Sequence, residues 1–296
     1  MIVKEISRAK INLALYVTGK RDDGYHDLCS LMSFIELCDD LEFDFQTSKV
    51  SVLCSHPDVP EDHTNLVCRA GALFFDKFLG IDKKQALTRG VAIKIRKRIP
   101  VGAGLGGGSS NAATVLKVLN RWYENPFSNM QLMKMGLSIG ADVPFFIHGG
   151  PAVAQGVGER LKKCNPLLPY HVLLFFPGIT ASTADVYKNI DLSLTKYGKS
   201  NINNLLKICE SGREVDIKDF LHNDLESSAL RLYPDIGYVK KEMARFLPEG
   251  VLMTGSGSSF FAIFSDYGKA DRAFRELSEK WEGSGKKIFL TCFAVN

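Results

Sequence analysis

Pro100-Val101-Gly102-Ala103-Gly104-Leu105-Gly106-Gly107-Gly108-Ser109-Ser110-Asn111-Ala112-Ala113 is the stretch of sequence that decides the fold. It follows an alternating segment, 91–96, that is typical of a strand, and it leads into apolar residues at helical spacing up to Trp122. Its five glycines allow positive φ angles and a close approach of the backbone to a ligand. The helix start adds unpaired N–H groups and the positive end of a dipole, so the stretch predicts a phosphate-binding loop.

Three alternatives to a phosphate-binding loop are less consistent with the sequence. A Walker loop needs a lysine directly after its last glycine, and Ser109 stands there, which excludes it. A dinucleotide fingerprint is formally present as Gly102-x-Gly104-x-x-Gly107. However, a second helix follows instead of a strand, and only Glu124, near a helix end, is available for the ribose. A turn without a ligand is disfavoured because so many glycines are costly in conformational entropy.

The rest of the chain mixes strands and helices without regular βαβ alternation, which indicates an α+β fold. Its 296 residues correspond to about two domains. We expect helices over 65–80, 112–122, 128–140, 201–209, 222–232, 235–246 and 269–281. We expect strands over 9–17, 41–45, 50–53, 91–96, 171–176, 251–254, 260–264 and 286–295, with a turn over 18–24 and a loop over 193–200.

Composition excludes several classes of protein. Lys and Arg number 37 against 33 Asp and Glu, and the net charge of +4 is spread along the chain, so we expect a small anionic partner and no nucleic acid. The seven cysteines are scattered without a Cys-x-x-Cys pair, which favours reduced thiols and a cytoplasmic protein. No apolar run approaches the ~20 residues of a membrane span, so we expect no membrane partner.

Three motifs, in order, resemble those of the GHMP kinases, the family of galactokinase, homoserine kinase, mevalonate kinase and phosphomevalonate kinase. They are the loop quoted above, residues 7–13 (Ser-Arg-Ala-Lys-Ile-Asn-Leu) and residues 254–259 (Thr-Gly-Ser-Gly-Ser-Ser). The resemblance implies a two-domain GHMP-kinase-like α+β fold. It implies an N-terminal ATP-binding domain over 1–155, a C-terminal domain over 156–296 and an active site in the cleft between them.

Four further motifs resemble one branch of this family, whose substrate carries a cytidine diphosphate. They read Gly-Tyr-His at 24–26, Gly-Ala-Asp-Val-Pro at 140–144, Gly-Val-Gly-Glu at 156–159 and Asn-Asp-Leu-Glu at 223–226. Arg8 stands where this branch usually has proline, which affects only the start of the strand. The resemblance implies ATP-dependent phosphorylation of a hydroxyl on a small cytidyl diphosphate substrate. It also implies Mg2+ bridging the ATP phosphates, and no obligate protein partner is evident.

The resemblance assigns the chemistry to Lys10 and Asp142. Lys10 would contact the reacting oxygens, while Asn12, on the same strand face, would orient the substrate. Asp142 would accept the proton of the substrate hydroxyl or only orient that hydroxyl. From the residues alone, a solvated strand face explains Lys10 and Asn12 equally well, and a helix cap is an alternative for Asp142.

A cytosine ring needs an aromatic face to stack on and hydrogen-bonding groups at its edge. The resemblance supplies Tyr25 as one stacking face and His26 as the edge partner, with Tyr187 as the other face and Thr183 nearby. Without the resemblance, packing and solvation explain a tyrosine and a histidine in a turn more readily.

For ATP, the resemblance implies contacts from Asn65 and from the loop residues Pro100, Val101, Gly102, Ala103, Gly104, Leu105, Gly106, Gly107, Gly108, Ser109 and Ser110. The two serine hydroxyls would cap the helix or touch a phosphate or its magnesium. A helix cap explains Asn65 equally well. We expect residues 255–257 to pack against the loop, a plain hairpin turn being the alternative. The five histidines other than His26 show no metal spacing, and the sequence assigns no ligand to Mg2+.

Two other functions are consistent with parts of this pattern. Another GHMP kinase acting on a small alcohol such as homoserine would not need Tyr25. A module that only senses a nucleotide would lack the Lys10–Asp142 pair, and both residues are present.

Overall fold

The computed structural model describes residues 2–82, 89–192, 198–211, 213–247 and 250–294, which form two compact units. The first comprises Met1–Ala9, Leu37–Val101 and Gly106–Gly149, and the second comprises Lys10–Glu36, Gly102–Leu105 and Gly150–Asn296. This division differs from a single boundary between residues 155 and 156. The reason is that a long hairpin and the glycine loop each contribute residues to both units.

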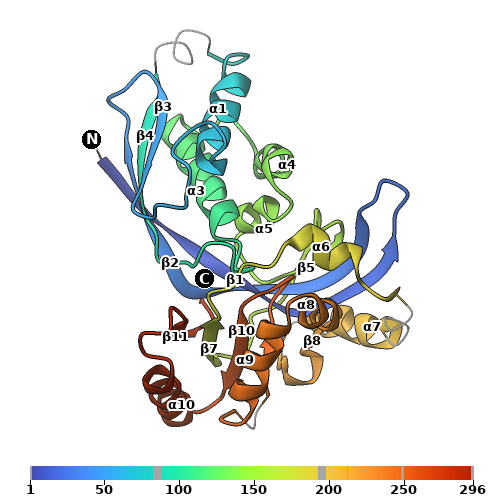
Figure 1. Cartoon of the computed structure of the whole chain (residues 1–296). Coiled ribbons are helices and arrows are strands. Elements are labelled where there is room, and N and C mark those ends of the chain that lie inside the picture. Colours follow the sequence, from blue (N-terminus) through green and yellow to red (C-terminus); the bar gives the residue numbers. More distant parts are fainter. Residues whose placement is uncertain (1, 83–88, 193–197, 212, 248–249, 295–296) are drawn as a thin grey trace. The chain divides into compact units, whose positions relative to one another are not determined.

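The hairpin consists of β1 (Ile2–Lys20) and β2 (His26–Asp44), each 19 residues long (Figure 1). A hydrogen bond from the Arg21 amide to the Tyr25 carbonyl oxygen, 2.9 Å long, closes its turn. Strand β1 is therefore longer than the predicted strand, and it takes up part of the predicted turn.

The central part of β1 is buried on both faces. Ile11 and Leu13 are fully buried on one face, and Lys10 and Asn12 on the other are only 5% and 4% exposed. The alternative that Lys10 and Asn12 lie on a solvated face is therefore wrong. A buried ammonium and a buried amide need hydrogen-bond partners, so these two side chains depend on their neighbours.

In the first unit the strand order is β3-β4-β2-β1, where β3 (Val50–Cys54) is parallel to β4 (Val91–Arg96) and β4 is antiparallel to β2. Four helices lie on one side of this sheet, α1 (Leu66–Phe78), α3 (Gly107–Trp122), α4 (Asn129–Ile139) and α5 (Val143–His148) (Figure 1). Alternate residues such as Leu41, Phe43 and Ile93 are buried, which explains why the sequence predicted these strands.

Two of these helices begin at the residues that the sequence indicated. The Asn65 side chain accepts a hydrogen bond from the Val67 amide at the start of α1. Ser128 and Gln131 form a reciprocal capping box at the start of α4. Each cap satisfies an amide that the helix itself leaves unpaired, so the helix starts are confirmed.

The second unit contains two sheets. One has the order β6-β5-β2-β1-β8 and adds β5 (Ala152–Gly156), β6 (Arg160–Lys163) and β8 (His222–Asn223) to the hairpin. The other has the order β11-β7-β10-β9, formed by β7 (His171–Phe176), β9 (Leu252–Met253), β10 (Phe260–Phe264) and β11 (Lys287–Cys292). The helices of the second unit are α6 (Thr183–Lys188), α7 (Gly198–Cys209), α8 (Glu226–Leu232), α9 (Pro234–Ala244) and α10 (Tyr267–Lys280), with a short 3-10 turn over Lys218–Phe220.

The hydrophobic core of the second unit joins the β11-β7-β10-β9 sheet to α9 and α10. Its buried side chains include Phe175, Phe260, Ile236 and Leu277.

One predicted helix of this unit is wrong at its start. The segment 222–232 begins as strand β8 and becomes helical only at Glu226. The reason is local, because Asn223 accepts a hydrogen bond from the Leu225 amide and Asp224 accepts one from the Val17 amide. Part of the predicted loop over 193–200 is also different: residues 193–197 lie outside the described residues, and α7 already begins at Gly198.

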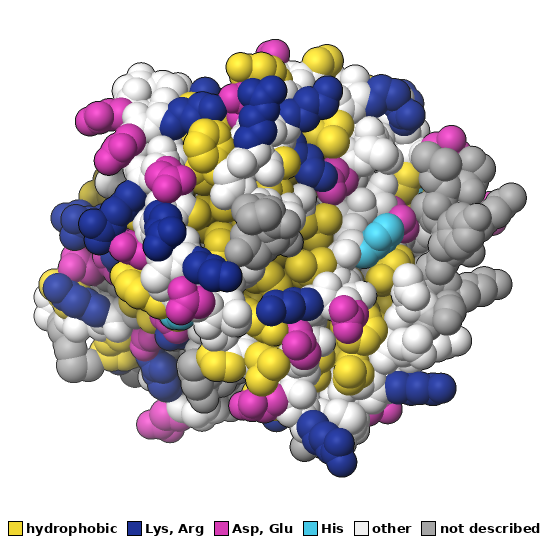
Figure 2. All heavy atoms as spheres, turned by 90° about the horizontal axis from the view of Figure 1, so that it is seen from below, with side chains coloured by type: hydrophobic (Ala, Val, Ile, Leu, Met, Phe, Trp, Pro, Cys, Tyr) yellow, Lys and Arg dark blue, Asp and Glu magenta, His cyan; other side chains and the backbone are white. Residues whose placement is uncertain are grey.

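Figure 2 shows one face of the molecule on which Lys and Arg side chains alternate with Asp and Glu, around hydrophobic side chains in the middle. Among the described residues on this face, neither charge forms a continuous stripe. Of the described helices, none combines the length and the apolar character that crossing a membrane would require.

Candidate active site

The start of α3 has the features of a phosphate site. Gly106 occupies the N-cap position with φ of +67°, and no side chain caps the helix there. Gly107 and Gly108 form the first turn without side chains of their own. The backbone amides of this turn are therefore available to an anion, and the helix dipole favours it.

The space beside Gly107 is filled by two residues that precede the loop. A Cβ atom on Gly107 would lie 2.9 Å from Nζ of Lys97 and 3.0 Å from Cγ2 of Ile99. A side chain at this position would require both neighbouring side chains to shift. The close approach therefore favours glycine here.

The two predicted serines of this helix differ in their contacts. The Ser110 hydroxyl is buried, donates to the Arg8 carbonyl oxygen at 2.6 Å and accepts from the Ser7 hydroxyl at 2.6 Å. It ties α3 to β1, and the Ser110 backbone amide donates to the Gly106 carbonyl oxygen at 2.8 Å, so the contact of Ser110 with ATP stays a prediction. Ser109 is half-buried, and its hydroxyl lies 3.6 Å from the position that a Cβ atom on Gly140 would take. The turn that carries Asp142 therefore lies beside the phosphate loop.

Asp142 precedes α5 at the N-cap position, but its carboxylate does not cap the helix. The capping alternative for Asp142 is therefore wrong. The side chain is half-buried, which leaves it accessible to a ligand. Its assignment as a catalytic residue stays a prediction, because Lys10 belongs to the other unit.

Asn65 uses both ends of its side chain within the first unit. Its Oδ1 accepts from the Val67 amide at 2.9 Å, and its Nδ2 donates to the Pro60 carbonyl oxygen at 2.6 Å. The helix-cap interpretation is confirmed, while the contact with ATP stays a prediction. Asn65 is placed near the loop by its neighbour, since Cδ1 of Leu66 lies 3.4 Å from the Cβ position of Gly108.

In the second unit, the first half of the glycine loop packs against the C-terminal glycine motif. A Cβ atom on Gly104, whose φ is +77°, would lie 2.6 Å from the carbonyl oxygen of Gly257. The Ser259 amide also donates to the Ala103 carbonyl oxygen at 3.3 Å. The predicted packing of residues 255–257 against the loop is confirmed.

Lys10 and Asn12 are joined by a hydrogen bond within this unit. The Lys10 ammonium donates to Oδ1 of Asn12 at 2.6 Å, and Nδ2 of Asn12 donates to the Ser30 hydroxyl at 2.8 Å. The Lys10 amide donates to the Leu105 carbonyl oxygen at 3.0 Å. Lys10 is therefore anchored to the phosphate loop through its backbone and to Asn12 through its side chain.

Gly255 closes this arrangement from the other side. A Cβ atom there would lie 3.1 Å from Oδ1 of Asn12 and 3.5 Å from Nζ of Lys10. The hydroxyl of the preceding residue, Thr254, accepts a hydrogen bond from the backbone amide of Asn12 at 2.7 Å. The C-terminal glycine motif thus holds the polar face of β1 in place.

The predicted base-binding residues lie partly together. The rings of His26 and Tyr187 are 5.5 Å apart between centroids, and the Thr183 hydroxyl is hydrogen-bonded to the Ser256 hydroxyl at 2.8 Å. Tyr25 is 65% exposed, so its ring is available for stacking. These four residues keep their assignments as predictions.

The buried position of His26 determines its charge. Burial, and to a lesser degree the charge of Lys20, hold the pKa of His26 below its ordinary value. The imidazole is therefore neutral at neutral pH. A neutral imidazole carries one donor and one acceptor, which suits the edge of a nucleobase.

Several residues of this arrangement were not predicted from the sequence. Ser30 and Thr254 position Asn12, and Nδ2 of Asn223 donates to the carbonyl oxygens of Met253 and Gly255 at 2.7 and 2.8 Å. The motif at 223–226 was the only signal for Asn223. Thr254 begins the motif at 254–259, but its contact with Asn12 was not predicted. Ser30 has no sequence signal, because only the fold brings it to β1.

The described side chains offer magnesium few ligands. They contain no group of three or more His, Cys, Asp or Glu placed to hold a metal ion. Mg2+ that arrives with ATP keeps phosphate and water ligands and needs only one or two from the protein. The hydroxyl of Ser109 and the carboxylate of Asp142, both in the first unit, fit that modest requirement.

Comparison with known proteins agrees with this geometry. The GHMP kinases N terminal domain matches residues 65–150, and the GHMP kinases C terminal model matches residues 204–283. A 4-diphosphocytidyl-2-C-methyl-D-erythritol kinase of Syntrophotalea carbinolica is 40% identical over 285 residues, which cover 96% of each chain. The chain belongs to the GHMP kinase family. The resemblance inferred from its motifs is thereby confirmed.

Other GHMP kinases extend the comparison. A 4-diphosphocytidyl-2-C-methyl-D-erythritol kinase of Clostridium kluyveri is 38% identical over 98% of this chain and 99% of its own. A crystal structure of 4-(cytidine 5'-diphospho)-2C-methyl-D-erythritol kinase superposes with a TM-score of 0.75 at 32% identity, covering 99% of this chain and all of the other. A homoserine kinase from Cytophaga hutchinsonii superposes with a TM-score of 0.70 at 16% identity, covering all of this chain and 95% of the other, which shows the shared GHMP kinase fold alone.

Proposed function

We propose that the protein uses ATP to phosphorylate the 2-hydroxyl of 4-diphosphocytidyl-2-C-methyl-D-erythritol, giving the 2-phosphate and ADP in the non-mevalonate route to isoprenoid precursors. The observation that carries the proposal is the 40% identity to a kinase of that name across 96% of both chains. The reduced state of the cysteines, all seven of which are free thiols, supports a place in the cytoplasm.

The cytosine of the substrate would lie against Tyr25 and Tyr187, with His26 at its edge. The 65% exposure of Tyr25 and the contact between the rings of His26 and Tyr187 support this. Base recognition through a neutral imidazole needs no charge on the substrate edge. Thr183, whose hydroxyl is held by Ser256, would contact the substrate nearby.

The phosphoryl transfer itself needs positioning and charge stabilisation more than a strong base. The substrate hydroxyl oxygen would attack the γ-phosphorus, its proton would pass to Asp142, and the bond from γ-phosphorus to the bridging oxygen would break to release ADP. Lys10 would neutralise charge on the oxygens of the transferring group. The amides at the start of α3 would hold the remaining phosphate oxygens.

Magnesium supplies charge neutralisation between the phosphates when it is bound. Ser109 and Asp142 are the residues of the first unit that would hold it, with ATP providing the other ligands. The fit rests on the oxygen chemistry of a half-buried hydroxyl at the start of α3 and of a half-buried carboxylate in the turn beside it.

The test is conversion of ATP to ADP by the purified protein with 4-diphosphocytidyl-2-C-methyl-D-erythritol, beside homoserine and mevalonate. Turnover with the cytidyl compound alone is the expected result. Turnover with a control compound instead would replace this substrate while keeping the family. Tyr25→Ala should raise the KM for the cytidyl compound and leave the KM for ATP unchanged, because ATP does not need the base-binding tyrosine.

A further inference from the structure

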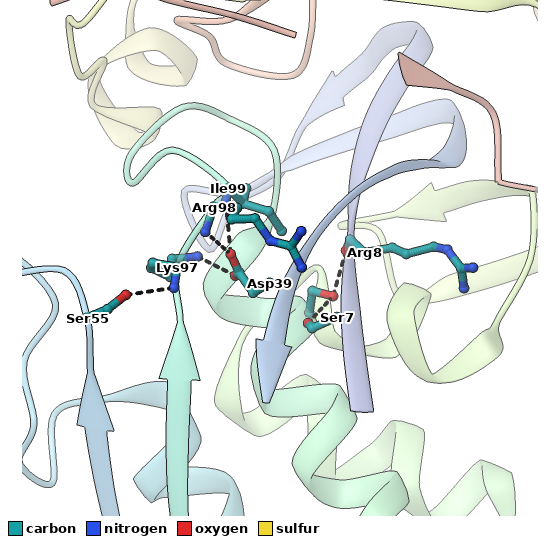
Figure 3. A network of polar contacts seen from close by, with 8 residues as sticks. Ser7, Arg8, Asp39, Ser55, Lys97, Arg98 and Ile99 are labelled. Carbon is teal, nitrogen blue, oxygen red and sulfur yellow. Dashed lines mark hydrogen bonds and ion pairs between the residues drawn. The ribbon is translucent and has the colours of Figure 1, made fainter. Parts of the chain in front are cut away.

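Asp39 is a fully buried carboxylate at the start of the glycine loop (Figure 3). It lies on β2 at alternate spacing with Leu41 and Phe43, so its side chain enters the same core layer as theirs. A lone carboxylate in such a layer is strongly destabilising, and replacing a buried ion pair by apolar residues is often neutral or stabilising. Its presence there calls for a specific role.

The partners of Asp39 all belong to the segment between β4 and the loop. Its Oδ1 accepts from the amides of Arg98 and Ile99 at 2.7 and 2.9 Å, and its Oδ2 accepts from the Lys97 ammonium at 2.5 Å (Figure 3). The Lys97 amide donates to the Ser55 hydroxyl at 2.9 Å. The backbone amides of residues 97, 98 and 99 are therefore all held by side chains. Pro100, which follows them, has no N–H group.

The same segment touches the other end of the loop. The Lys97 ammonium and the Ile99 side chain lie 2.9 and 3.0 Å from the Cβ position of Gly107, the first residue of α3. A shift of residues 97–99 would therefore move or open the helix start. That helix start carries the amides that the proposed function gives to the ATP phosphates.

We infer that Asp39 is a positioning residue for ATP. It fixes residues 97–99 through two backbone amides and one ammonium group, and these residues in turn fix the start of α3. The inference rests on the proposed function to the extent that it takes ATP as the ligand of the loop. It concerns ATP affinity and not the cytidyl substrate.

The test compares two replacements of similar size, Asp39→Asn and Asp39→Leu, each combined with Lys97→Met. The second substitution removes the ammonium, so neither protein buries an unpaired charge. The asparagine oxygen still accepts from the two amides, whereas leucine leaves both unpaired. We expect the leucine protein to bind a non-hydrolysable ATP analogue at least about tenfold more weakly than the asparagine protein, by isothermal titration calorimetry.

A matched control is available on the next residue of the same strand. Asp40 pairs with the Arg98 guanidinium, is partly exposed, and belongs to the opposite face of β2. Asp40→Asn and Asp40→Leu should bind the ATP analogue with equal affinity. The asparagine and leucine proteins at position 39 should bind 4-diphosphocytidyl-2-C-methyl-D-erythritol with affinities that agree within about twofold. A loss of affinity for the ATP analogue alone is not what general destabilisation would produce.

Each outcome is decisive. Equal affinity of the two Asp39 proteins for the ATP analogue, or an equal loss for both ligands, would overturn the inference. If the leucine protein does not fold, Asp39→Ser replaces it, and the inference then requires an affinity between that of the asparagine protein and no binding. Wild-type protein that binds the analogue but does not phosphorylate the cytidyl compound overturns the proposed function alone. Wild-type protein that binds no ATP overturns both.

Discussion

The Lys10 ammonium donates a 2.6 Å hydrogen bond to Oδ1 of Asn12, and both side chains are buried. The amide of Asn12 cannot turn over, because its Nδ2 donates to the Ser30 hydroxyl, which donates in turn to the Ala14 carbonyl oxygen. These two hydrogen bonds therefore determine that the oxygen of the Asn12 side-chain amide faces Lys10. A residue assigned to the substrate also determines where the lysine ammonium lies.

Asn12→Leu should lower kcat by about 10- to 100-fold. The isosteric leucine keeps the volume but removes the oxygen that holds Lys10, and misplacement of one charged group costs about this much. Steady-state kinetics with both substrates would measure the effect. Ser30→Ala is the milder control, since it removes only the partner behind Asn12, and it should reduce kcat by less. A smaller effect for Asn12→Leu than for Ser30→Ala would contradict this order.

Asp142→Asn should lower turnover at least ~100-fold, because an amide cannot accept the proton of the substrate hydroxyl. ADP production measures turnover, and thermal unfolding shows that the variant is folded at the assay temperature. Lys10→Met should lower turnover as well, and the double variant should fall short of the product of the two losses if both residues act on one hydroxyl. Independent, multiplicative losses would argue against a shared hydroxyl.

Much of the fold could be predicted from local patterns, and the exceptions have physical causes. Helical spacing and good capping residues mark α1 and α4, whose caps Asn65 and Ser128 lie where the sequence indicated. Strand β2 begins well before its predicted start because residues 29–35 are buried on both faces, which removes the alternation that marks a strand. The added residues of β1, 2–8 and 18–20, are mostly exposed or half-buried. Strand β8 escaped prediction because it is only two residues long and leads directly into a segment with helical spacing.

The site shows the same division between local and distant information. The glycine motifs predict that Gly104 meets residues 255–257, because glycines mark places where backbones approach closely. The partners Ser30 and Asp39 have no such mark. Asp39 lies 58 residues before Lys97 in the sequence, and a buried aspartate on an alternating strand resembles an exposed one until the fold is known.

His26 should make substrate binding sensitive to acid. Its pKa lies below the ordinary value of 6.5, so the ring is neutral above that pH and takes up a proton only as the pH falls below it. The neutral ring of His26 contributes fully to the free energy of unfolding above pH 6.5. This contribution is lost at lower pH, because His26 in the unfolded chain binds the proton more readily. The KM for the cytidyl compound should rise as the pH falls from about 8 to about 5.5, and His26→Gln should flatten that rise. An identical pH dependence in both proteins would remove His26 from the base site.

Gly104→Ala should destabilise the protein more than a glycine replacement with the same backbone angle elsewhere. Gly104 has φ of +77°, and its Cβ would lie 2.6 Å from the Gly257 carbonyl oxygen. Gly283 has φ of +69° and no described atom within 4 Å of its Cβ position. Gly283→Ala should cost ~1–2 kcal/mol of backbone strain, and Gly104→Ala a further ~1–3 kcal/mol of overlap, by urea unfolding. Equal losses would mean that the loop and the C-terminal motif separate at little cost.

Asn223 should be required for its ability to donate. Its Nδ2 donates to the carbonyl oxygens of Met253 and Gly255, which sets the loop against Lys10 and Asn12. In Asn223→Asp a carboxylate faces two carbonyl oxygens, so the pKa of the new side chain is raised and its protonated form, which donates one hydrogen bond, is favoured in the folded state. A raised pKa stabilises the folded protein at low pH and loses that effect as the pH rises. Unfolding free energy and kcat, each relative to wild type, should therefore recover as the pH falls from about 8 to about 5.5.

The isosteric Asn223→Leu separates this effect from a general loss of packing. Leucine leaves both carbonyl oxygens without their donor at every pH, at a cost of about 2–4 kcal/mol, and cannot titrate. Taking each value relative to wild type at the same pH removes the titration of His26, which all three proteins share. Recovery in acid by the aspartate protein alone would show that a donated hydrogen bond places the Gly255 loop. Parallel behaviour of the two variants would mean that Asn223 acts only by filling space, and Lys10 and Asn12 would then owe their positions to Thr254 and Ser30.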